Sequence, residues 1–76
     1  MAGLPFIHNQ RSYVARVRRD GGKAVAEVFN ADGSSTHCTV DASDDTLSDM
    51  KAQGDDDPLR RLQEKVRDVF MGRSKF

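Results

Sequence analysis

The sequence predicts an α+β fold, in which a three-stranded antiparallel β-meander packs against a C-terminal amphipathic α-helix. Three observations support this class. Segments rich in β-forming residues alternate with Asp-Gly turns between residues 12 and 40. Apolar residues recur at helical spacing within residues 58–71. The chain has 76 residues, of which 37% are hydrophobic, so we expect a single domain, residues 1–76, with a thin core.

The meander is expected to contain three strands. Ser12–Arg19 ("SYVARVRR") alternates apolar and basic residues, as a half-buried strand does. Asp20–Gly22 supplies the glycine of a hairpin turn, and Lys23–Asn30 is the returning strand. Ala31–Ser35 contains a second Asp-Gly turn, after which Thr36–Val40 is the third strand.

The register of the first hairpin depends on the length of its turn. A two-residue Gly-Gly turn places Arg16 opposite Glu27, which is a favourable cross-strand pair. A three-residue turn would instead align Tyr13 with Phe29 on one face. We favour the two-residue turn.

Residues 1–11 are expected to form an N-terminal arm or a short fourth strand at the sheet edge, with Phe6 and Ile7 buried. The start of the chain lacks the basic region and long apolar run of a signal peptide. No apolar stretch approaches the length of a membrane span, so we expect no membrane association.

The C-terminal helix is the clearest element. Asp57 should cap it, Pro58 suits its first position, and Gly72 should end it before a tail of residues 72–76. The apolar residues fall on one stripe that should pack on the sheet: Leu59, Leu62, Val66, Val69 and Phe70. The basic residues should face solvent: Arg60, Arg61, Lys65 and Arg67.

Residues 41–57 form an acidic connection between the sheet and the helix. Seven of these seventeen residues are Asp. Ser43 or Thr46 should cap a short helix that runs to Ala52 and stops at Gly54, because their hydroxyls accept hydrogen bonds from first-turn N–H groups. An ordered loop is the alternative.

Charge is segregated along the chain, although the formal net charge is +0. Residues 1–40 sum to +2, residues 41–57 to −6 and residues 58–76 to +4. Such a pattern indicates a charged partner or self-association. Helix capping accounts for only part of the acid. The candidate partner-binding residues are therefore Asp44, Asp45, Asp49, Asp55 and Asp56.

A basic surface is the competing candidate. Arg16 and Arg18 on the first strand, together with Arg60 on the helix, could contact a phosphate backbone. A solvated face explains these residues more simply, and the few aromatic side chains are needed for the core rather than for stacking on bases. We therefore expect no direct nucleic-acid binding.

Cys38 is the only cysteine, which excludes an intrachain disulfide and fits a reducing cytoplasm. Alternation places it on the same face as Thr36 and Val40. It is either a small buried hydrophobic residue or a thiol on an edge strand, where two copies could meet as a homodimer and cross-link on oxidation.

The motifs of catalysis and metal binding are missing. "DASDDTLSD" lacks the spacing of an EF-hand loop, and His8, His37 and Cys38 are not placed to form a metal or Cys/His catalytic site. There is no phosphate-binding glycine loop and no nucleophile elbow. We expect a binding protein rather than an enzyme, with no cofactor and no metal.

Three stretches carry a family resemblance: "YVARVRRDGGKAVAEVFNADGSSTHCTV", "DASDDTLSD" and "DDDPLRRLQEKVRDVF". In size, order and charge pattern the chain resembles the phage-encoded anti-CRISPR proteins directed against type I surveillance complexes. The resemblance implies that it binds a type I Cas complex in the cytoplasm of a bacterial host and blocks target DNA binding. The Asp patch would then compete for the basic surface that holds DNA.

Two other function classes stay open. Strands followed by "DDTLSDMKAQ" resemble the sheet-then-helix order of HicB-type antitoxins, although the glycine- and aromatic-rich strands of that family are missing. This likeness implies an antitoxin-like or regulatory protein-binding module. The β-β-β-α order with the three arginines above is compatible with a small nucleic-acid-binding domain.

Overall fold

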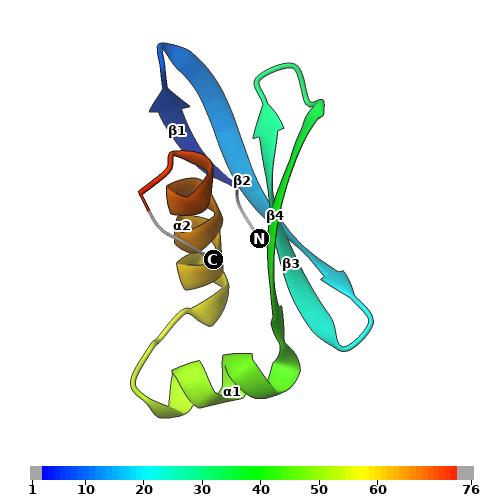
Figure 1. Cartoon of the computed structure of the whole chain (residues 1–76). Coiled ribbons are helices and arrows are strands. Elements are labelled where there is room, and N and C mark those ends of the chain that lie inside the picture. Colours follow the sequence, from blue (N-terminus) through cyan, green and yellow to red (C-terminus); the bar gives the residue numbers. More distant parts are fainter. Residues whose placement is uncertain (1–2, 74–76) are drawn as a thin grey trace.

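The computed structural model describes residues 3–73 and confirms the α+β class. The strands are β1 (Leu4–His8), β2 (Arg11–Asp20), β3 (Lys23–Asn30) and β4 (Ser35–Ser43), and the helices are α1 (Asp44–Ala52) and α2 (Pro58–Phe70). Within these residues the strands form one antiparallel sheet in the order β1-β2-β3-β4 (Figure 1). The sheet is therefore a simple meander with β1 and β4 at its two edges.

The N-terminal arm forms the fourth strand. The predicted burial of Phe6 is confirmed, and that of Ile7 is wrong. Phe6 packs against the core, whereas the side chain of Ile7 is 70% exposed. Adjacent strand residues point to opposite faces of a sheet, so the two cannot both be buried on one side. The turn that follows holds Asn9 and Gln10 at positive φ, which matches a two-residue type I′ hairpin.

The first predicted hairpin has the two-residue turn. Asp20 pairs with Lys23, and Arg16 pairs with Glu27, as we favoured; the three-residue alternative is wrong. Gly21 has a φ of 63°, a conformation that costs little without a Cβ atom. The register of this hairpin thus follows from turn chemistry.

The last strand extends further than predicted. β4 continues past Val40 to Ser43, where Ala42 pairs with Ala24 and packs against the core. Asp41, on the solvent face, forms an ion pair with Lys23 on the neighbouring strand, at 3.1 Å from Oδ2 to Nζ. Such a pair lets a charged residue occupy the solvent face of a sheet. A bulge interrupts the strand earlier, where His37 takes a φ of 61°.

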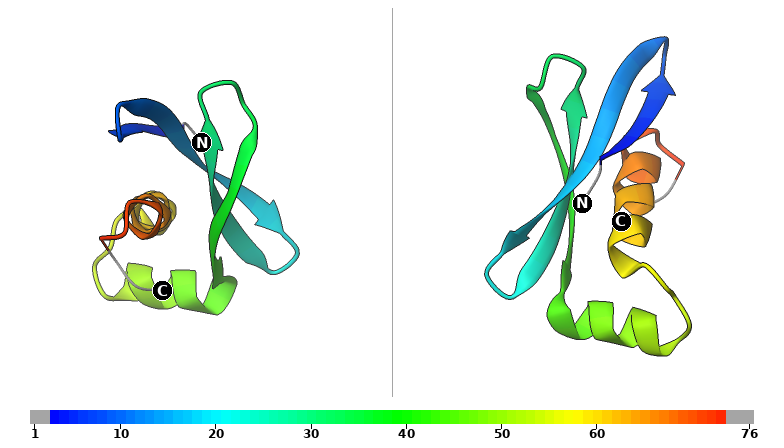
Figure 2. Two further views of the ribbon diagram at one scale, coloured as in Figure 1. Left: turned by 45° about the horizontal axis from the view of Figure 1, so that its top comes forward. Right: turned by 180° about the vertical axis from the view of Figure 1, so that it is seen from behind.

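α2 packs on one face of the sheet, and no element within residues 3–73 covers the other face, called the uncovered face below (Figure 2). Leu62 and Val66 are buried, and Leu59, Val69 and Phe70 pack against the core, so the predicted stripe is confirmed. The β residues beneath this helix are mostly small and fully buried: Ala15, Ala24, Ala26 and Val28. On the uncovered face, Val14 lies opposite the half-buried Phe29.

The two ends of α2 are fixed by different contacts. Asp57 caps its start by accepting a hydrogen bond from the Arg60 N–H at 3.1 Å, as predicted. At its other end the Phe70 ring packs edge-to-face on the Tyr13 ring, with 4.7 Å between the ring centroids. Gly72 ends the helix at a φ of 77°, and residues 74–76 of the expected tail lie outside the described residues.

Two polar residues of α2 depart from the expected pattern. Gln63 is only 1% exposed, and its Nε2 donates a hydrogen bond to the Ala15 carbonyl at 3.1 Å. Arg67 was expected to face solvent, but its side chain is 29% exposed and contacts Asp68 at 3.1 Å. The Gln63 bond ties α2 to β2 through a buried polar contact.

We expect Gln63→Ala to lower the free energy of unfolding by about 2–3 kcal/mol, since it removes a hydrogen bond of about 1 kcal/mol and leaves a cavity. Urea unfolding followed by circular dichroism measures this change. Lys65→Ala, on an exposed position of the same helix, is the control and should shift stability by no more than about 0.5 kcal/mol. Equal losses in both variants would contradict the role given to Gln63.

Candidate protein-binding surface

The acidic connection folds mainly into α1, which crosses the end of the molecule below α2 (Figure 1). Ser43 is the cap: its Oγ accepts a hydrogen bond from the Thr46 N–H at 3.2 Å. Asp44 and Asp45 occupy the first turn, where carboxylates interact favourably with the helix dipole. Leu47 packs against the core and holds α1 in place.

Much of the acid is neutralised by bases from the flanking segments. Asp44 Oδ1 lies 2.7 Å from Arg19 Nη2, and Asp55 Oδ2 lies 3.4 Å from Arg61 Nε. Two of the five candidate residues are therefore engaged within the fold. The sequence shows the acidic and basic segments, but only the tertiary structure shows which carboxylate pairs with which arginine.

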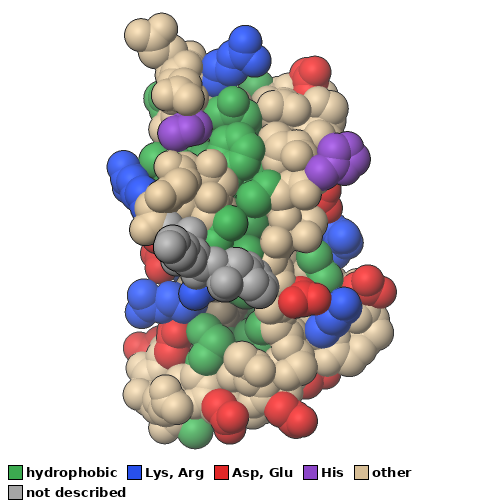
Figure 3. Space-filling view, viewed as in Figure 1, with side chains coloured by type: hydrophobic (Ala, Val, Ile, Leu, Met, Phe, Trp, Pro, Cys, Tyr) green, Lys and Arg blue, Asp and Glu red, His purple; other side chains and the backbone are tan. Residues whose placement is uncertain are grey.

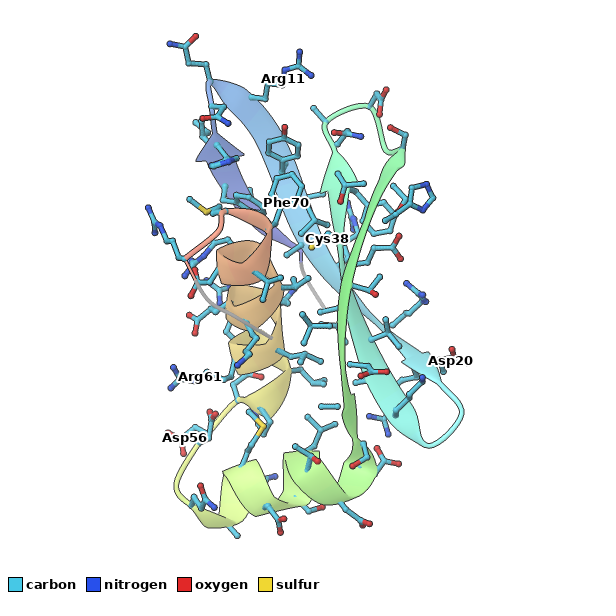
Figure 4. All side chains as sticks on the ribbon, in the orientation of Figure 1. Arg11, Asp20, Cys38, Asp56, Arg61 and Phe70 are labelled. Carbon is cyan, nitrogen blue, oxygen red and sulfur yellow. The ribbon has the colours of Figure 1, made fainter. Side chains whose placement is uncertain are left out.

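The other three candidates are exposed and make no ion pair within residues 3–73. We call Asp45, Asp49 and Asp56 the acidic end surface. Asp45 and Asp49 are four residues apart on α1 and so lie on the same side of the helix. Asp56 lies on the loop between the two helices (Figure 4). Acidic side chains are visible along this end of the molecule (Figure 3).

The three arginines of the basic alternative are not brought together. Arg16 and Arg18 project from the uncovered sheet face, as their alternation with the core residue Ala15 requires. Arg60 is on α2, which packs on the opposite face, and lies 4.0 Å from Glu64. The structure therefore does not bring these residues into a single basic surface.

The uncovered face carries a small polar network that sequence reasoning missed. Glu27 accepts hydrogen bonds from Ser35 Oγ and from Arg18. The Ser35 bond, followed by the contact with Arg18, holds the pKa of the Glu27 carboxyl below its usual range. Ser35 Oγ also accepts the His37 N–H at 2.9 Å and so links this network to the bulge.

Cys38 is half-buried on β4 and packs against the core. Burial raises the pKa of its thiol, which makes the thiolate less available at neutral pH. Among residues 3–73 no group of three or more His, Cys, Asp or Glu side chains is placed to hold a metal ion.

A hollow of about 470 Å³ lies where β4, α1 and α2 meet. Its apolar lining is Val40, Ala42, Met50 and Leu62, and its polar and charged lining is Asp41, Thr46, Arg61 and Lys65. The sequence carries no direct signal for this hollow, because its walls come from three separate elements.

Comparison of the chain with protein-family models, with curated proteins and with solved structures finds no match. None of the helices in residues 3–73 combines the length and the apolar character needed to cross a membrane.

We expect Ser35→Ala to raise the pKa of Glu27, since the largest contribution to its depression is lost. A depressed carboxyl pKa stabilises the fold above the unfolded-state pKa, and this stabilisation is lost as pH falls through the folded-state pKa. The variant should therefore have a lower free energy of unfolding than the parent at neutral pH, and the difference should shrink as the pH falls. A carboxyl titration by NMR measures the pKa.

Ser34→Ala is the matched control, because Ser34 donates in the same way to Asp32, whose pKa is lowered mainly by that bond. This variant should raise the pKa of Asp32 and leave that of Glu27 in place. If Ser35→Ala left the Glu27 titration unchanged, the assigned hydrogen bond would be refuted.

Proposed function

We propose that the chain acts by binding a basic surface of another protein through the acidic end surface, Asp45, Asp49 and Asp56. The observation that supports this most is the position of Asp49. It lies in the last turn of α1, where a carboxylate opposes the helix dipole, and no base neutralises it within residues 3–73. Because this carboxylate is exposed and does not stabilise its own helix, it is available to a basic partner.

The partner chemistry follows from the charge. Carboxylates spaced along one short helix fit a protein groove lined by Lys and Arg, such as one that holds nucleic acid. Attraction over several ångströms speeds encounter, and burial of the complementary charges then provides specificity. The chain resembles type I-directed anti-CRISPR proteins in size, order of elements and charge pattern. We therefore propose that its partner is the DNA-binding surface of a type I Cas surveillance complex.

The proposed role is inhibition by occupancy and requires no catalysis, cofactor or metal. A chain seated in the DNA-binding groove would exclude target DNA as long as it stays bound. An antitoxin-like module would use the same acidic end surface on a different basic partner. The separation of Arg16 and Arg18 from Arg60 gives less support to a role in nucleic-acid binding.

The test is co-purification of the tagged chain with several type I surveillance complexes, followed by a gel-shift assay with target DNA. We expect stable co-elution and loss of the DNA shift. The chain alone should not shift DNA or RNA. Failure to co-elute with any of the complexes would contradict the proposed partner, and a salt-sensitive shift by the chain alone would favour nucleic-acid binding instead.

The double variant Asp45→Asn/Asp49→Asn should weaken partner binding by about tenfold or more, which corresponds to ~1.4 kcal/mol. The loss should be largest at low salt, because screening reduces the charge contribution in the parent chain. Calorimetric titration measures the affinity.

Asp32→Asn is the control for the loss of an acidic charge elsewhere on the surface, since Asp32 is exposed at the β3–β4 turn, at the opposite end of the sheet from α1 (Figure 1). It should leave the affinity unchanged. Equal affinities for the double variant and the parent, with both folded by circular dichroism, would show that the acidic end surface is not the binding surface.

A further inference from the structure

The two edges of the sheet are not equivalent. The two-residue β1–β2 turn directs the backbone groups of Pro5 and Ile7 outward, and Pro5 has no N–H to offer. β1 is therefore short and blocked at its outer edge. β4 has nine residues, contains no proline and, among the strands of residues 3–73, pairs with β3 alone.

The outward backbone groups of β4 can be identified from the register. The Asp44 N–H donates to the Gly22 carbonyl at 3.1 Å, and Ala42 and Val40 are paired with even-numbered residues of β3. In an antiparallel ladder, hydrogen-bonding groups alternate between the two sides of a strand. The N–H and C=O groups of Thr39 and Asp41 therefore point away from β3, along the free edge.

An apolar surface continues beside this edge. Cys38, Val40 and Ala42 point to the α2 side of β4. The hollow between β4, α1 and α2 opens next to them. Figure 3 shows hydrophobic side chains exposed in a strip between α2 and the backbone of β4. A strand added at this edge would extend the sheet and the apolar face together.

We propose that the occupant of this edge is a second copy of the chain, paired β4 to β4 antiparallel about a two-fold axis at Val40. The proposal does not depend on the acidic end surface. In this register Thr39 faces Asp41 of the other copy and exchanges both backbone hydrogen bonds with it. Cys38 faces Ala42, and Val40 faces itself, so the apolar strips of the two copies meet.

Charge and backbone geometry select this register over its neighbours. An axis at Asp41 would place two carboxylates directly opposite each other, which is unfavourable. An axis at Thr39 would require regular pairing at His37, whose left-handed conformation breaks the strand. The Val40 axis separates the carboxylates and keeps residues 38–42 in regular pairing, with His37 only at the end of the ladder, opposite Ser43 of the other copy. Its self-complementary pairs are what an isologous interface requires.

This register also decides the role of Cys38. Its partner across the interface is Ala42, so the two Cys38 residues lie four positions out of register and cannot bridge. The dimer should form equally in reducing and oxidising buffer.

The first test is cross-linking in a Cys38→Ser background. Val40→Cys places two thiols at a non-hydrogen-bonded pair with Cα atoms about 4.5 Å apart, within disulfide range. Ala42→Cys is the control, because its two copies are about 13 Å apart along the strands. We expect the Val40→Cys chain to form a covalent dimer on mild oxidation, at least tenfold faster than the Ala42→Cys chain.

The second test blocks the edge. Thr39→Pro removes an outward N–H without removing a β3–β4 hydrogen bond, whereas Thr39→Val keeps the N–H. Sedimentation velocity should give a dimer for the parent and for Thr39→Val, and a monomer for Thr39→Pro with unchanged circular dichroism. A parent chain that stays monomeric up to about 1 mM, or a dimer in which Ala42→Cys cross-links in preference to Val40→Cys, overturns the proposal. The monomeric result would exclude a second copy and leave a strand of another protein as the occupant to test.

Discussion

The structure depends on how closely α2 can approach the sheet. Ala15, Ala24 and Ala26 have no exposed surface and form the centre of the covered face. Their methyl side chains leave space for Leu62 and Val66 of the helix, so a thin core can still be closely packed. The position of α2 then fixes the loop that precedes it, and this loop holds α1 across the end of the molecule. The acidic end surface is thus displayed by this loop, which carries Asp56, and by α1, which has no fully buried residue and carries Asp45 and Asp49.

Ion pairs formed on folding reduce the acidic surface that the charge pattern of the sequence suggests. The segregated blocks in the sequence suggest one large acidic surface, but Arg19 and Arg61 from either side reach back to Asp44 and Asp55. Exposed pairs of this kind contribute at most about 1 kcal/mol each, so their main effect is on the surface potential rather than on stability. The carboxylates without an ion pair are therefore the smaller set that forms the acidic end surface.

Much of the fold could be predicted because local rules decide it. Turn chemistry fixed the pairing of Arg16 with Glu27, and capping residues fixed the starts of both helices. The extension of β4 could not be predicted, since it depends on the pairing of Ala42 with Ala24, and the Asp-rich stretch that begins at Asp41 gives no strand signal. The burial of Gln63 likewise requires knowledge of which carbonyl lies above it. For the acidic end surface, the sequence identified the residue type and segment, and tertiary contacts decided which members are engaged.

The alanine side chains beneath α2 also limit which substitutions this sequence can accept. A larger side chain at Ala15 or Ala26 must displace α2, and overpacking costs about 1–3 kcal/mol. This is a large share of the roughly 3–5 kcal/mol that holds together a domain of this size. Descendants of this chain should therefore keep small residues on the covered face, while the exposed side of α1 and the turns drift. The alternating small residues of β2 and β3 should therefore be among the last to change.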